Sequence, residues 1–136
     1  MGQQQLLLII LGVIVVGIAV AVGITMFTDS AINANRDALG NDLVNLAARA
    51  QMFYRRPTSL GGGGNSFNLL TTDAITLLTN KPTNGNGSYF IETAGTGSGT
   101  NAVVVIKGIG NELFNGSPVA LHVFVFPDRD SMVTVN

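Results

Sequence analysis

An uncharged apolar run near the N-terminus constrains this chain more than any other feature. From Leu6 to Phe27 the sequence reads LLLIILGVIVVGIAVAVGITMF, about 22 residues in which only glycines and Thr25 interrupt the apolar pattern. This is the length of a helix that crosses a bilayer. At about 1.5–3 kcal/mol per large apolar side chain, exposing the run to water would cost on the order of tens of kcal/mol. We therefore expect it to lie in lipid or against other apolar helices.

A cleavable secretory signal differs from this N-terminus in two ways. Such a signal has a basic first segment and an apolar core of only about 7–15 residues. Residues 1–5 carry no positive charge, and the first basic residue of the chain is Arg36. Because no Lys or Arg precedes the apolar run to orient it in a membrane, one hypothesis is that a short basic leader has been removed upstream.

The helix is predicted to continue beyond its apolar half. Residues 28–56 contain no proline, and their apolar side chains recur mostly at three- or four-residue steps, as in an amphipathic helix. Gly40 is the one weak helix former among them. The stripe expected to pack against a globular head consists of Leu39, Leu43, Leu46, Ala50 and Phe53.

The sequence also predicts where this helix ends and how far it protrudes. Arg55 and Arg56 place positive charge at the negative end of the helix dipole, and Pro57 disfavours helical geometry at the residue before it. A continuous helix over residues 1–56 is about 80 Å long, whereas the remaining residues form a globule only about 30 Å across. About half of the helix must therefore protrude, and that half is the apolar segment 6–27.

Residues 57–136 are predicted to form a β-rich head, which makes the fold class α+β. Residues 58–66, with four consecutive glycines, are typical of a flexible loop, and residues 71–79 indicate one short helix. Only the last strand connection, 127–130, is short enough for a tight hairpin. An antiparallel meander is predicted from four segments rich in β-branched and aromatic residues: Ser88–Thr93, Ala102–Ile109, Pro118–Phe126 and Ser131–Val135.

The third of these strands is expected to lie centrally. From Val119 to Phe126 both of its faces are apolar, apart from His122. Such a pattern is typical of a strand that is covered on both sides. The amphipathic half of the helix would cover one side, and a neighbouring subunit is a candidate for the other.

Few residues are suited to catalysis or metal binding. The chain has no cysteine, and its one histidine, His122, lies between apolar residues. Asp128 and Asp130 suit a turn better than a calcium site, and nothing marks Glu92 and Glu112 as a catalytic pair. With 11% charged residues and a net charge of −1, the chain offers no basic patch for nucleic acid. We expect no enzymatic activity, cofactor or metal.

An aliphatic half-helix that runs unbroken into an amphipathic half, followed by a Gly-rich loop and a small sheet, resembles the type IV pilin superfamily. The likeness is most specific over residues 2–27. It implies the structural subunit of an extracellular helical filament at the cell surface, with a membrane-inserted pool before assembly. The implied partners are further copies of the chain, a prepilin peptidase, and a membrane assembly platform with an ATPase.

The apolar half is the predicted polymerisation core. Gly17 with Ala21, and Ala19 with Gly23, are small residues four apart, which allow neighbouring helix backbones to approach closely. A bundle staggered along its axis is a heterologous contact, which does not close and so produces a filament. The side chains expected to form this core are Leu6, Leu7, Leu8, Ile9, Ile10, Leu11, Val13, Ile14, Val16, Gly17, Ile18, Val20, Ala21, Ile24 and Phe27.

Three features depart from the pilin pattern. The family's glutamate near the mature N-terminus is absent: Gln5 stands there if Met1 is the first mature residue, and Leu7 if Gln3 is. A charge-pairing model of assembly is therefore not supported. The helix-breaking proline of many bacterial members is also missing, which predicts a continuous rod. The cysteine pair that cross-links the head in many bacterial members is absent too.

Two other functions remain open from sequence. The chain is also consistent with a single-span membrane-anchored binding protein, in which residues 6–27 only tether the head. It is likewise consistent with a pseudopilin that forms a short secretion piston. An enzyme is the third and least favoured class.

Overall fold

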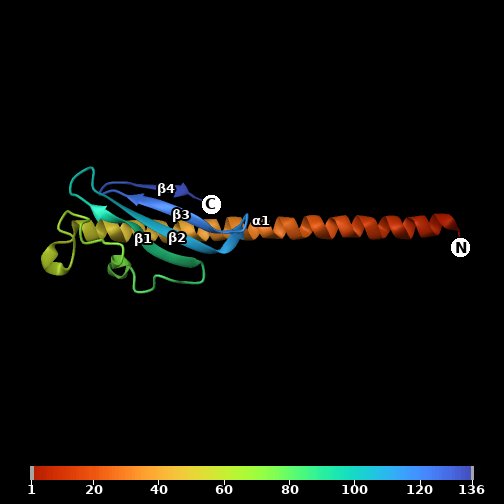
Figure 1. Cartoon of the computed structure of the whole chain (residues 1–136), viewed down its shortest axis with the longest axis horizontal. Helices are drawn as coiled ribbons and strands as arrows, with labels where there is room; N and C mark the ends of the chain where they lie inside the picture. Colours follow the sequence, from red (N-terminus) through yellow and green to blue (C-terminus); the bar gives the residue numbers. More distant parts are fainter. Residues whose placement is uncertain (1, 136) are drawn as a thin grey trace.

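The computed structural model describes residues 2–135, which form one long helix with a four-stranded sheet against its C-terminal half (Figure 1). This is the α+β fold that the sequence predicted. The N-terminal half of the helix extends away from the head, and no other element accompanies it in Figure 1 among the described residues. The elements are α1 (Gln3–Arg55), η1 (Thr58–Leu60), η2 (Ala74–Leu77), β1 (Gly87–Thr96), β2 (Val103–Phe114), β3 (Ser117–Val125) and β4 (Asp130–Thr134).

Helix α1 is continuous over 53 residues and ends one residue before the predicted boundary. Arg56 is already extended, with ψ 134°, because it precedes a proline. Its N–H still donates to the Met52 carbonyl at 3.0 Å, which satisfies the last turn. Gly40 does not interrupt the helix: a Cβ at this position would lie 3.6 Å from Met132 Sδ of β4, so the glycine lies beneath the sheet.

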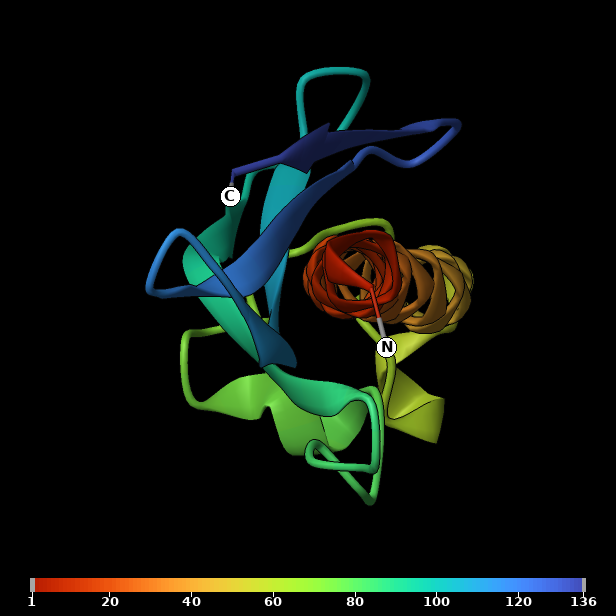
Figure 2. The ribbon, with the colours of Figure 1, turned by 90° about the vertical axis from the view of Figure 1, so that its right-hand side faces the viewer.

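The strands form an antiparallel meander in the order β1-β2-β3-β4. Strand β3 is central, as predicted from its apolar character on both faces, and so is β2. One row of residues crosses the sheet in register, from Phe90 through Lys107 and His122 to Val133. Figure 2 shows α1 against one face of this sheet.

One sequence prediction about the head was wrong. Residues 110–117 were expected to be a loop, but β2 continues to Phe114 and β3 begins at Ser117. Asn115 and Gly116 alone make the turn, with φ of 51° and 80°. Asn-Gly is the preferred pair for a two-residue hairpin turn, so the sequence did contain a hairpin signal here. The polar residues before it resembled a longer loop and obscured that signal. The short helix predicted within residues 71–79 is present as a four-residue 3-10 helix, Ala74–Leu77, with Asp73 at its N-cap.

The core lies between α1 and the inner face of the sheet. Leu39 and Leu43 of α1 are fully buried against a sheet face that includes Ile91, Ile106 and Val123. The opposite face is partly exposed; there, Phe90, Lys107, Ile109, His122 and Phe124 all show intermediate exposure. The helix therefore covers one side of the central strands, and the expected cover on the other side is not supplied within residues 2–135.

Candidate assembly surface

The protruding half of α1 presents its apolar side chains to the surroundings on all sides. Every residue of the predicted polymerisation core is exposed in the single chain. Among the large side chains the exposed fraction ranges from 52% at Ile14 to 82% at Phe27. The helix contains an 18-residue window of mean hydropathy 3.2, none of it buried, and is long and apolar enough to cross a membrane. Exposure of so large an apolar surface to water is strongly unfavourable, so we expect it to be covered by lipid or by other apolar helices.

The glycines of this surface have no packing role within the single chain. A Cβ added at Gly12, Gly17 or Gly23 would meet no atom within 4 Å. Glycine inside a helix costs about 1 kcal/mol relative to alanine. Because nothing in the described chain approaches these backbone positions, they are open to close contact with another helix.

The hydroxyl groups of the apolar half are satisfied by their own helix. Thr25 Oγ1 donates to the Ala21 carbonyl at 3.1 Å, and Thr28 Oγ1 donates to the Ile24 carbonyl at 3.0 Å. These hydroxyls therefore need no water, and the segment can enter lipid or a helix bundle without leaving a polar side chain unpaired.

The second half of α1 fixes the head on the rod. All five residues of the predicted packing stripe are buried: Leu39, Leu43, Leu46, Ala50 and Phe53. The structure adds Ile32, Ala47 and Tyr54 from the same helix. These three residues also fit the helical period, because an i+3 and an i+4 neighbour can both lie on one face of a helix. Ile32 is the first buried residue of α1, so the head begins five residues beyond Phe27.

A polar cluster reinforces this attachment at the edge of the core. One oxygen of Asp42, Oδ2, accepts hydrogen bonds from Asn84 Nδ2 and Asn86 Nδ2, each at 2.9 Å, and from the Tyr89 hydroxyl at 2.5 Å. Burial alone would raise the pKa of the Asp42 carboxyl, but the hydrogen bonds to its charged form outweigh burial and hold that pKa below its ordinary value. Burial and the nearby carboxylate raise the pKa of Tyr89 far above its ordinary range.

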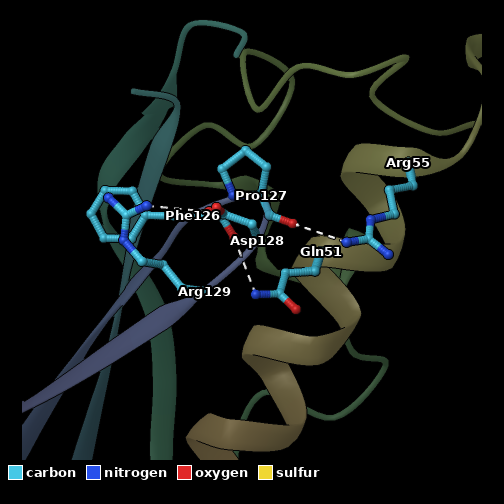
Figure 3. A network of polar contacts seen from close by, with 6 residues as sticks. All are labelled: Gln51, Arg55, Phe126, Pro127, Asp128 and Arg129. Atoms are coloured by element: carbon cyan, nitrogen blue, oxygen red, sulfur yellow. Dashed lines mark hydrogen bonds and ion pairs between the residues drawn. The ribbon is translucent and has the colours of Figure 1, made fainter. Parts of the chain in front are cut away.

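A second set of contacts attaches the far end of α1 to the turn between β3 and β4 (Figure 3). Gln51 Nε2 donates to the Phe126 carbonyl at 3.1 Å, and Arg55 donates to the Pro127 carbonyl at 3.3 Å. Arg129 lies 4.3 Å above the Phe126 ring and 3.3 Å from the Asp128 carboxylate. Asp128 thus pairs within its own turn, and the turn docks on the helix.

The remaining cluster of titratable residues, Glu92, Lys107 and His122, lies on the described part of the sheet. No group of three or more His, Asp or Glu side chains lies together there. His122 Nε2 is 3.0 Å from Glu92 Oε2, and Lys107 Nζ is 3.2 Å from the other oxygen of the same carboxylate. These three residues come from adjacent strands on the outer face of the sheet, and Glu112 is not part of the cluster.

The chain matches no protein-family model, no curated protein and no solved structure.

Proposed function

We propose that this chain is the structural subunit of an extracellular, type IV pilus-like helical filament that polymerises through the apolar half of α1. The observation that carries the proposal is the exposure of residues 6–27 on a helix whose head begins only at Ile32. In a filament these segments would bundle in the centre and the heads would lie outside. The role is structural, with no enzymatic step.

The energetics favour a shared apolar environment. Burying the large side chains of residues 6–27 contributes on the order of tens of kcal/mol in total, which the chain's own head cannot supply. Lipid offers the same apolar environment before assembly, so subunits can wait in the membrane and later exchange lipid for one another. Helix–helix contact in lipid then depends on close packing, for which Gly17 and Gly23 leave open backbone.

The shape of the chain favours a filament over a closed oligomer. Neighbouring rods that are staggered along the axis place their heads at different levels, so the heads do not compete for space. A staggered contact joins two different surfaces and repeats without closing. The prepilin peptidase, assembly platform and ATPase implied by the resemblance would process and extrude such a subunit.

A single-span anchor and a pseudopilin remain the alternatives. In the anchor, residues 6–27 would stay in lipid permanently and the head would act as a binding module. A pseudopilin would make a short polymer that does not leave the cell surface. Electron microscopy of sheared surface material separates the three, because only the pilus gives long filaments that contain this chain.

The decisive variant pair is Ile14→Arg and Val44→Arg. Both positions are exposed aliphatics on α1, at 52% and 49%, but only Ile14 lies in the apolar half. An arginine at position 14 would be buried without a partner in the bundle, so filaments should be lost while the head stays folded. Val44→Arg should retain filaments. Wild-type chain found only as a membrane-bound monomer would refute the polymer and favour the anchor.

A further inference from the structure

The hairpin that joins β2 to β3 reaches the end of the head nearest the apolar half of α1 (Figure 1). Strand β2 runs antiparallel to the helix: Gly108 lies beside Leu43, and Gly110 lies beside Leu39 and Asn35. The Glu112 N–H approaches Asn35 Oδ1 at 3.5 Å. From there the strand continues toward the protruding half of α1 for two further residues before the turn at 115–116.

The tip of this hairpin carries apolar side chains that the head does not cover. Leu113 is 56% exposed and Phe114 is 36% exposed. The Phe114 ring also has the Arg36 guanidinium 4.9 Å from its centroid, which positions the ring beside α1. Two exposed apolar residues at a two-residue turn have no role in the core, since the core cluster includes neither.

The tip lies at the depth of a membrane interface when residues 6–27 span a bilayer. The run of about 22 residues measures about 33 Å, which matches the hydrocarbon thickness of about 30 Å. Ile32, where the head begins, is about 7.5 Å beyond Phe27 along the helix. The polar interface of each leaflet is about 5–7.5 Å deep, so Ile32 lies at its outer edge. The hairpin continues from the level of Asn35 toward the protruding half of α1 and therefore reaches into the headgroups.

The charges around the tip indicate which lipid surface suits it. Asp29 and Glu112 are exposed near this level, and the Arg36 guanidinium lies over the Phe114 ring. The acids outnumber the arginine, so attraction to anionic lipid does not drive the contact. An apolar tip with this charge balance suits the interface of a zwitterionic bilayer, where aromatic and aliphatic residues partition.

We propose that the tip of the β2–β3 hairpin, Leu113 and Phe114, inserts into the lipid interface while the subunit waits in the membrane. The hairpin is then a second membrane contact beside the spanning helix, and it holds the head at a fixed height and orientation over the bilayer. This inference rests on the membrane-inserted pool of the proposed function, but it does not depend on whether the chain later polymerises.

The absence of tryptophan from the sequence allows a direct test. Leu113→Trp gives the full-length chain a single tryptophan at the tip. Leu69→Trp is the matched control, because Leu69 is 55% exposed and precedes Leu70, whose carbonyl bonds to Gly95 near the far end of β1. Ile14→Trp reports on the spanning helix. Each variant is reconstituted in phosphatidylcholine vesicles with quencher-labelled lipid, the label lying near the headgroup or deep in the acyl chain.

We expect the emission of a Trp at position 113 to shift to the blue and to be quenched most by the shallow label. A Trp at position 14 should be quenched most by the deep label. A Trp at position 69 should emit like a water-exposed residue. Position 113 behaving like position 69, while position 14 is quenched, would overturn the hairpin contact and leave the membrane pool intact. Position 14 without quenching would overturn both.

Phe114→Trp is a second fluorescent probe at the tip, and it keeps an aromatic ring beside Arg36. Circular dichroism of each variant checks that the fold is retained. Replacing part of the phosphatidylcholine with anionic lipid should leave the shallow quenching unchanged or weaker. A rise in quenching with anionic lipid would contradict the apolar character of the contact.

Discussion

The Tyr89 hydroxyl donates to Asp42 Oδ2 at 2.5 Å and thereby links the first strand of the sheet to the helix that carries the head. Tyr89 is only 4% exposed, and Asn84 and Asn86 donate to the same oxygen. A carboxylate that receives three donors at the edge of a core is well satisfied, and it fixes the rotation of the sheet about the helix axis.

Removal of the tyrosine hydroxyl should destabilise the head. In Tyr89→Phe the aromatic ring keeps its packing, but Asp42 loses one of its donors, at an expected cost of about 1.5–3 kcal/mol for a hydrogen bond to a charged group. Denaturant unfolding of the full chain in detergent micelles, followed by near-UV circular dichroism, measures the change. Tyr54→Phe is the control: among residues 2–135 its hydroxyl accepts one neutral donor, the Gly99 N–H at 3.1 Å, so a smaller loss of about 0.5–1.5 kcal/mol is expected. Equal losses would argue against a special role for the Asp42 cluster.

The same carboxylate should make the stability of the head depend on pH. The folded-state pKa of Asp42 lies below its ordinary value, so its contribution is fully present above the unfolded pKa of about 3.9 and is lost as the pH falls through the folded-state pKa. The free energy of unfolding should therefore not vary through this group between about pH 5 and 8 and should fall below about pH 4. Asp42→Asn should be less stable at neutral pH and should lose less on acidification. An identical acid response in wild type and variant would exclude Asp42 as its source.

Adjacent residues on α1 allow a matched test of how the head is attached. Leu43 is fully buried and Val44 is 49% exposed. Leu43→Ala should lower the free energy of unfolding by about 2–5 kcal/mol, because it leaves a cavity between helix and sheet. Val44→Ala should change it by no more than about 0.5 kcal/mol. Thermal unfolding in micelles measures both, and a large effect at Val44 would place the helix–sheet contact on a different face.

The elements with long or periodic signals were predictable from the sequence. The apolar run indicated the rod, and the stripe around Leu43 indicated the face that packs, because a 3.6-residue period sustained over several turns is typical of an amphipathic helix. Strand positions, apart from the end of β2, were predicted to within a few residues from their β-branched and aromatic content. The two-residue turn at Asn115 was missed because polar residues before it resembled a loop, although β2 continues through them to Phe114.

The polar contacts of the head lay beyond sequence reasoning. Asp42 is followed by Asn84, Asn86 and Tyr89 only after more than 40 residues, and no local pattern brings them together. Likewise, the contact of Gln51 with the Phe126 carbonyl depends on where the turn between β3 and β4 meets the helix. Such contacts depend on the tertiary arrangement, and the periodic pattern of apolar residues in the sequence does not predict them.

Substitution of Gly17 tests how the helices would meet in the proposed filament. A side chain added there meets nothing within 4 Å in the single chain, so Gly17→Leu should leave head stability and membrane insertion unchanged. In a bundle that uses the glycine for close approach, the larger side chain should cost about 1–3 kcal/mol per subunit. The critical concentration for polymerisation should then rise by about 5- to 150-fold. Gly17→Ala keeps a small residue and should have a weaker effect. Sedimentation of polymer from detergent-diluted protein measures both, and unaltered assembly of Gly17→Leu would show that the rods do not approach at this glycine.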